Sequence, residues 1–154
     1  EKLSDTPCEV LVQEDTFFNT SRGRLKLRVL AADHGQLIFY EREDSPAPKR
    51  SDYVISTTSE PSSLKAVLAT ALGIRGIVRK RRLVYKIGET RIHLDEVEGL
   101  GAFVELEVVL GTDESVEGGE TKAVKLMAKL GIEQGDLVEG AYIDLLSLLR
   151  SINA

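Results

Sequence analysis

The sequence predicts an α+β fold in which helices pack on the outside of an antiparallel sheet. Two observations predict this fold. Short segments that alternate apolar and polar residues recur along the chain with turn residues between them. Other segments repeat apolar residues at the spacing of an amphipathic helix. The 154 residues have the size of one ordinary domain, and the sequence contains no internal repeat.

Three strands are expected in the first part of the chain. Residues 22–30 form a strand rich in cations, and Asp33-His34-Gly35 is a hairpin turn that leads into a strand over 37–42. Residues 43–52 contain two prolines and no apolar period, which predicts a loop. A third strand is expected over 53–57.

A helix is expected to begin near residues 59–61, where a capping serine and an early proline are favourable, and to end at Gly73. Alternation and then helical periodicity predict three further strands and two helices. The strands are expected over 76–87, 90–95 and 102–110, and the helices over 118–130 and 139–150.

Four cations occupy alternate positions of the first expected strand: Arg22, Arg24, Lys26 and Arg28. Successive side chains of a strand point to opposite faces, so all four would share one face. Neighbouring charges would lie roughly 6.5–7 Å apart. Such a row repels itself unless an anion lies along it, so this strand predicts an anion-binding site.

Later strands also have one aliphatic and one charged face. Surface sheets usually mix the two signs, because like charges opposite one another cost about 0.2–1 kcal/mol per pair. Here cations line 22–28 and 80–86, whereas carboxylates line 95 and 105–107. This separation favours a barrel whose charged faces line a water-filled tunnel and whose aliphatic faces lie under the helices. A half-solvated sheet without a site would show the same alternation and stays the alternative. The residues concerned are Lys80, Arg82 and Lys86 in one strand, Arg91, His93 and Asp95 in the next, and Glu105 and Glu107 in the last.

These side chains suit phosphate chemistry. Arginine and lysine bind phosphate oxygens through charge-assisted hydrogen bonds. Carboxylates spaced as Glu105 and Glu107 project together and can share Mg²⁺ or Mn²⁺. A polyphosphate held between cations and a carboxylate-bound metal is a recurring arrangement for phosphoryl transfer.

Composition limits the partners and the compartment. The net charge of −5 argues against a nucleic-acid partner. No run of about 18 apolar residues occurs, which predicts no membrane partner. The single cysteine cannot form an internal disulfide, which fits a reducing compartment, so a cytoplasmic location is expected.

Three other residues have open interpretations. His93 is interpreted as a structural histidine, with contact to a substrate as the alternative, and His34 as a solvated turn residue. Asp15 is interpreted as a residue that caps or orients a neighbouring cation, with a metal role as the alternative.

Several short segments occur in an order that is typical of one family. They are Asp15–Phe18, Gly23–Arg28, Ile38–Arg42, Pro48–Tyr53, Lys80–Arg82 and the stretch L-D-E-V-E-G-L-G from Leu94 that continues to Glu105-Leu106-Glu107. Over residues 13–150 the chain resembles the CYTH domain, the triphosphate tunnel metalloenzyme superfamily, and most of all its class IV adenylyl cyclase-like branch.

The resemblance implies an eight-stranded antiparallel tunnel that binds a triphosphate with Mg²⁺ or Mn²⁺. Members cyclise ATP or hydrolyse thiamine triphosphate, inorganic tripolyphosphate or RNA 5′-triphosphates. A second copy of the chain, in a homodimer, is a further candidate partner. By the same resemblance, catalysis would depend on Lys80, Arg82, Glu105 and Glu107, and the metal would be held by Glu105 and Glu107 with Asp95 in a supporting or metal role. Phosphate oxygens would be bound by Lys26, Arg28, Arg42, Lys49, Lys80 and Arg82.

One departure from the family concerns its E-x-E-x-K motif, which is not found in residues 1–154. Residues 1–12 are expected to be the end of the helix that follows the motif's strand, so the chain is expected to be a single CYTH-like domain without that strand. Either an upstream segment carries the motif, or this member lacks half of its metal carboxylates. The first case predicts a metal-dependent cyclase or triphosphate phosphohydrolase, and the second a non-catalytic module that binds polyphosphate or nucleotides.

Overall fold

The structure is a computed structural model that describes residues 4–41, 52–111 and 114–152. Its strands are β1 (Glu9–Phe18), β2 (Arg24–Ala31), β3 (His34–Glu41), β4 (Asp52–Thr58), β5 (Ile74–Ile87), β6 (Thr90–Val97) and β7 (Gly101–Val108). Its helices are α1 (Pro61–Leu72), α2 (Val116–Leu130) and α3 (Tyr142–Ile152), with a 3-10 turn η1 (Gln134–Asp136) before α3. All strand pairs are antiparallel, in the order β4-β3-β2-β1-β5-β6-β7. The predicted α+β class with an antiparallel sheet is confirmed.

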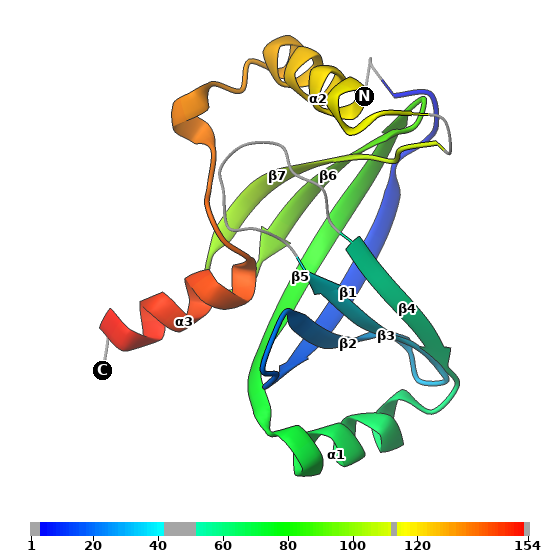
Figure 1. The fold of residues 1–154 in the computed structure, drawn as a ribbon, viewed down its shortest axis with the longest axis vertical. Helices are drawn as coiled ribbons and strands as arrows, with labels where there is room; N and C mark the ends of the chain where they lie inside the picture. Colours follow the sequence, from blue (N-terminus) through cyan, green and yellow to red (C-terminus); the bar gives the residue numbers. More distant parts are fainter. Residues whose placement is uncertain (1–3, 42–51, 112–113, 153–154) are drawn as a thin grey trace.

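The predicted closure into an eight-stranded barrel is wrong for the residues that the structure describes. Seven strands form one sheet, and β4 and β7 are its two edges. The twist of the strands curves the sheet around a concave face, as Figure 1 shows. Closure requires the two edges to meet at the ordinary strand spacing of about 4.8 Å, and β4 and β7 are not hydrogen-bonded to each other.

The helix end that was expected over residues 1–12 is absent from the described residues 4–12, and from Glu9 on the chain forms a strand at the centre of the sheet. Residues 1–3 lie outside the described residues. β1 pairs with β2 on one side and with β5 on the other. Its alternation places Gln13, Asp15 and Phe17 on the concave face, and all three are buried. The segment is a strand because it alternates with a period of two, and polar residues on its concave face mask that pattern in the sequence.

The row of cations in β2 has three members, because the expected strand begins two residues later. Gly23 has a φ of 60°, a left-handed conformation that glycine adopts without strain, and the chain turns there. Arg22 is therefore outside the sheet, where its Nε lies 3.6 Å from an Oε1 atom of Glu41. The hairpin turn also differs, since it comprises residues 32–33 and His34 already belongs to β3.

Two helices lie outside the sheet at opposite ends of the molecule (Figure 1). α1 contacts β1, β2 and β3, and its Lys65 forms an ion pair of 2.8 Å with Glu14 on the convex face. α2 packs on β7 and on the residues that follow it, where a Cβ at Gly119 would lie 3.8 Å from the side chain of Val108 and 2.5 Å from that of Leu110. Within the described residues, no helix has the length and apolar character needed to cross a membrane.

All helices were expected to pack on the outside of the sheet, but α3 packs against the concave face instead. Ile143 of α3 is 2% exposed and lies in a core cluster with Phe17, Val78 and Val97, whose side chains belong to the concave face. Asp144 fixes the same end of α3, because its carboxylate accepts hydrogen bonds from Arg24 and Arg75. α3 therefore covers one end of the concave face.

Candidate functional site

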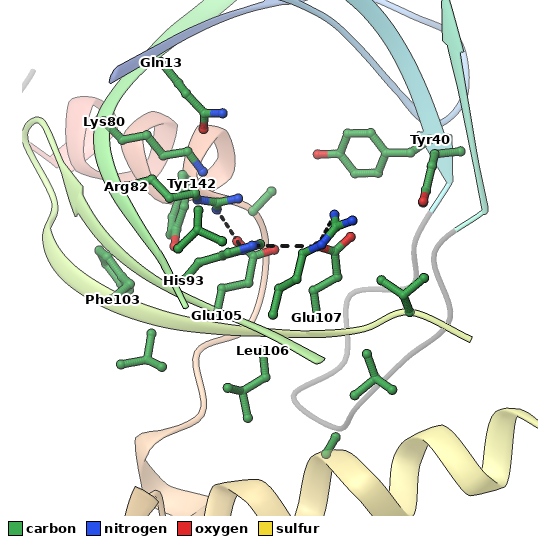
Figure 2. A pocket seen from close by; sticks show the side chains of 18 of the residues that line it. Gln13, Tyr40, Lys80, Arg82, His93, Phe103, Glu105, Leu106, Glu107 and Tyr142 are labelled. Atoms are coloured by element: carbon green, nitrogen blue, oxygen red, sulfur yellow. Dashed lines mark hydrogen bonds and ion pairs between the residues drawn. The ribbon is translucent and has the colours of Figure 1, made fainter. Parts of the chain in front are cut away.

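The concave face of the sheet lines a cavity of about 1490 Å³. Pockets for small molecules usually measure about 300–1,000 Å³, so this cavity is large. It extends around β7 to the apolar space under α2, and in Figure 2 Leu106 points to that side of β7, away from the charged residues. The polar groups on the concave side form the candidate site.

A first cluster consists of Asp15, Lys26 and Arg28. Asp15 is 3% exposed and lies directly opposite Arg28 in the register of β1 and β2. Lys26 Nζ donates to Asp15 Oδ2 at 2.8 Å, and Arg28 donates from Nε and Nη2, each at 2.8 Å. Burial raises the pKa of Asp15, but the charges and hydrogen bonds of the two cations outweigh burial and hold this pKa below its ordinary value. Asp15 is therefore ionised and holds both cations in place.

A second cluster consists of Asp95, Lys80, Arg82 and Tyr142. Asp95 is 2% exposed and accepts hydrogen bonds from Lys80 Nζ at 3.0 Å and from Arg82 Nε and Nη2 at 2.6 Å each. The Tyr142 hydroxyl donates to Asp95 Oδ2 at 3.0 Å. Burial and the nearby Arg82 charge lower the pKa of Lys80 to about 8. Burial and the Asp95 charge raise the pKa of Tyr142, so its hydroxyl keeps its proton.

The two clusters share one design. Each has a lysine and an arginine two residues apart on one strand and an aspartate opposite the arginine on the neighbouring strand. Both Arg28 and Arg82 bind their aspartate through Nε and Nη2, so Nη1 is not used by that carboxylate. In the two clusters four cations face two aspartates, and this local excess of positive charge suits an anion.

Carboxylates from β7 complete the charged part of the cavity. Glu105 Oε2 lies 2.5 Å from Arg82 Nη2 and 3.7 Å from His93 Nδ1, and Glu107 Oε2 lies 3.7 Å from His93 Nε2. Figure 2 shows Arg82, His93 and Glu105 converging on the concave side of β6 and β7. Burial raises the pKa of Glu105, but His93, Arg82 and Lys80 outweigh burial and lower it, so Glu105 is ionised.

Two of the carboxylates in the cavity, Glu105 and Glu107, are suited to serve as ligands of Mg²⁺ or Mn²⁺. In the described parts of the chain, no group of three or more His, Cys, Asp and Glu side chains is arranged as a ready metal site. Asp95 does not fit, because cations occupy both of its oxygens and its side chain is enclosed. Glu105 and Glu107 fit, because their side chains are 41% and 35% exposed, and Mg²⁺ commonly uses one or two carboxylates with phosphate and water.

The structure brings most of the predicted site residues to one cavity. Lys26, Arg28, Lys80, Arg82, Glu105 and Glu107 all line it, whereas Asp95 lies beneath the cations and Arg42 and Lys49 lie outside the described residues. Asp15 orients two cations, in line with its first interpretation. The contact of Tyr142 was missed. Its partner Asp95 is 47 residues away, and no local pattern signals a contact across that separation.

Comparisons with known proteins find similar chains and the same fold. The protein "Putative adenylate cyclase" of Methanocaldococcus jannaschii is 23% identical over 143 residues, which cover 88% of this chain and 82% of that protein. A solved structure of a Pyrococcus horikoshii protein has a TM-score of 0.80 at 23% identity and covers 89% of this chain and 83% of its own. An X-ray structure named as a "putative adenylate cyclase" from Vibrio parahaemolyticus has a TM-score of 0.71 at 20% identity and covers 92% and 85%.

The chain also matches a protein family over most of its length. The CYTH domain matches residues 1–142, which include β1 to β7 and the first residue of α3. The chain therefore belongs to the CYTH domain family.

Proposed function

We propose that this chain is a metal-dependent enzyme that binds a triphosphate on its concave face and either cyclises or hydrolyses it. The observation that carries the proposal is the convergence of two buried lysine–arginine pairs on one cavity, with Glu105 at its wall. The family supports the triphosphate, and the names of the two relatives support an adenylyl cyclase-like reaction.

The four cations would bind the phosphate oxygens. Asp15 and Asp95 fix the cations before a ligand arrives, so little ordering is required when a phosphate binds. The Nη1 groups of Arg28 and Arg82 are the donors that the aspartates leave unused. In a cavity with little water, these fixed charges would stabilise the negative charge that develops on the transferring phosphoryl group.

Glu105 and Glu107 would hold Mg²⁺ or Mn²⁺, which when bound neutralises phosphate oxygens. Glu105 also pairs with Arg82 at 2.5 Å, so this carboxylate connects the cationic and the acidic parts of the site. Lys80 and Arg82 would lie on the cationic side of the bound triphosphate, held there by Asp95.

Two reactions fit this arrangement. In hydrolysis, a water oxygen attacks the terminal phosphorus, the bond from that phosphorus to its bridging oxygen breaks, and orthophosphate leaves. In cyclisation, the ribose 3′-oxygen loses its proton to solvent and attacks the α-phosphorus of ATP, and pyrophosphate leaves. The names of the relatives favour cyclisation, whereas hydrolysis of tripolyphosphate requires no pocket for a base.

A non-catalytic polyphosphate-binding module is the second candidate. The observation that favours it is the lack, in the described residues, of a group of three metal-ligating side chains. Such a module would use the same four cations and would bind a triphosphate without turnover.

The test is to incubate the protein with ATP and with tripolyphosphate in the presence of Mn²⁺ and to measure orthophosphate and cyclic AMP. Formation of either product supports the enzyme, and Glu105→Gln should then abolish metal-dependent turnover while the circular dichroism spectrum is unchanged. Glu96→Gln, on the exposed convex face of β6, is the matched control and should keep wild-type turnover. Tight binding of both compounds without product would favour the binding module, and no binding would overturn both candidates.

A further inference from the structure

His93 has a buried nitrogen that the hydrogen bonds of the structure do not explain. The residue lies in the middle of β6, is 5% exposed and lines the cavity on the concave face. Its Nδ1 atom is buried without a hydrogen-bond partner. Buried polar atoms of this kind are uncommon in folded proteins, and each one needs an explanation such as an ion that binds it.

The neighbours of His93 identify the side from which a partner could come. The residue opposite His93 on β5 is Val84, which offers no polar side-chain atom. The residue opposite it on β7 is Glu105, whose Oε2 lies 3.7 Å from Nδ1. This distance is too long for a hydrogen bond. Figure 2 shows the imidazole of His93 directed to the same region as the Glu105 carboxylate.

The distance between these two atoms is close to that of two ligands of one metal ion. Bond lengths of about 2.0–2.2 Å from a metal to nitrogen and oxygen place two ligand atoms roughly 3.0–3.5 Å apart. The observed separation of 3.7 Å therefore needs only a small rotation of either side chain.

The second nitrogen of His93 supports the same assignment. Nε2 lies 3.7 Å from Oε2 of Glu107. A histidine that binds a metal through one nitrogen usually donates its other N–H to a carboxylate, which fixes the tautomer and the ring orientation. This distance is also too long for a hydrogen bond, but a small rotation of either side chain would let Glu107 accept that N–H and leave Nδ1 for the metal.

We propose that His93 Nδ1 and a Glu105 oxygen together bind a divalent first-row transition metal such as Co²⁺, Ni²⁺ or Zn²⁺ more tightly than Mg²⁺. An imidazole nitrogen suits these metals, whereas Mg²⁺ prefers oxygen ligands. The inference rests on the proposed function in that it takes Glu105 as a metal ligand, and it adds His93 and the class of metal. Water and phosphate oxygens would supply the remaining ligands.

The two histidines of the chain allow a sharp test, because His34 is an exposed residue at the start of β3. All variants carry Cys8→Ser, which removes the free thiol as a competing ligand. Calorimetry measures Co²⁺ and Mg²⁺ affinity with and without tripolyphosphate. His93→Gln should weaken Co²⁺ binding about tenfold or more and leave Mg²⁺ binding unchanged, and His34→Gln should change neither.

Nuclear magnetic resonance gives a second measurement that does not depend on the folding of His93→Gln. In the His34→Gln chain, labelled with ¹⁵N, the only imidazole signals come from His93. Addition of Zn²⁺ should shift its Nδ1 signal as expected for a coordinated nitrogen.

Wild-type Co²⁺ affinity in a folded His93→Gln variant, or an unshifted Nδ1 signal, would overturn the inference. If the protein still binds Mg²⁺ and tripolyphosphate in that case, the proposed function stands without His93 as a ligand. If the wild-type chain binds no divalent ion under any of these conditions, both the inference and the metal-dependent mechanism are wrong.

Discussion

The hydroxyl of Tyr142 donates a hydrogen bond of 3.0 Å to Oδ2 of Asp95, which also accepts hydrogen bonds from Lys80 and Arg82. Tyr142 is the first residue of α3, and Lys80 Nζ lies 5.2 Å from the centroid of its ring. The C-terminal helix is therefore bonded to the carboxylate that orients one half of the cationic site. Docking of α3 and the geometry of the phosphate-binding residues depend on each other.

Tyr142→Phe should lower the free energy of unfolding by about 1.5–3 kcal/mol, because it removes a hydrogen bond to a buried charged group. Urea denaturation followed by circular dichroism measures the change. The matched control is Tyr53→Phe, since Tyr53 is 56% exposed, and it should change the stability by less than about 0.5 kcal/mol. Equal effects of the two substitutions would show that the hydroxyl of Tyr142 does not fix α3.

Asp15→Asn should lower the free energy of unfolding by about 3–5 kcal/mol at pH 7, because Lys26 and Arg28 lose a buried opposite charge. The folded state lowers the pKa of Asp15, so its stabilisation is present above the unfolded value of about 3.9 and is lost as the pH falls below it. The difference between variant and wild type should thus shrink in acid. Asp33→Asn, in the exposed turn after β2, serves as the control. A constant difference from pH 7 to pH 3 would contradict the account.

ATP should bind more weakly as the pH rises through about 8, because burial and the Arg82 charge lower the pKa of Lys80 to about 8. Above that value the amine loses the charge that would attract phosphate. In the unliganded protein, the lowered pKa of Lys80 makes the fold more stable as the pH rises, whereas it makes ATP binding weaker. The unfolded state binds more protons between about 8 and 10.4, so this group makes folding more favourable as the pH rises in that range.

Calorimetric titrations of ATP without metal from pH 6.5 to pH 9.5 measure the effect. Lys80→Arg is the control, because an arginine stays protonated throughout this range and the titration of ATP itself is the same for both proteins. The affinity of the variant should follow the titration of ATP alone and should not decline near pH 8. A parallel decline in both proteins would remove Lys80 from the binding site.

Alternation along single strands was enough to predict which cations share a face. Lys26 and Arg28, and likewise Lys80 and Arg82, are two residues apart, and all four point to the cavity. The same pattern could not predict how far the sheet closes, because closure depends on twist and edge pairing, which involve several strands at once.

The partners of these cations depend on register, which the sequence does not show. Asp15 and Asp95 lie opposite Arg28 and Arg82 only because β1 pairs with β2, and β5 with β6, in the observed registers. β1 itself was missed because Gln13 and Asp15 are polar and still buried.

The central claim is that cations of the concave face bind the triphosphate. The most direct measurement compares the affinity for tripolyphosphate of Arg82→Gln and Arg81→Gln, two neighbouring arginines of β5 whose side chains lie on opposite faces. Near-ultraviolet circular dichroism verifies that both variants are folded. The account predicts that Arg82→Gln weakens binding about 10- to 150-fold, the effect of a lost charged hydrogen bond, whereas Arg81→Gln binds as the wild type does. Wild-type affinity in Arg82→Gln, or an equal loss in both variants, would contradict it.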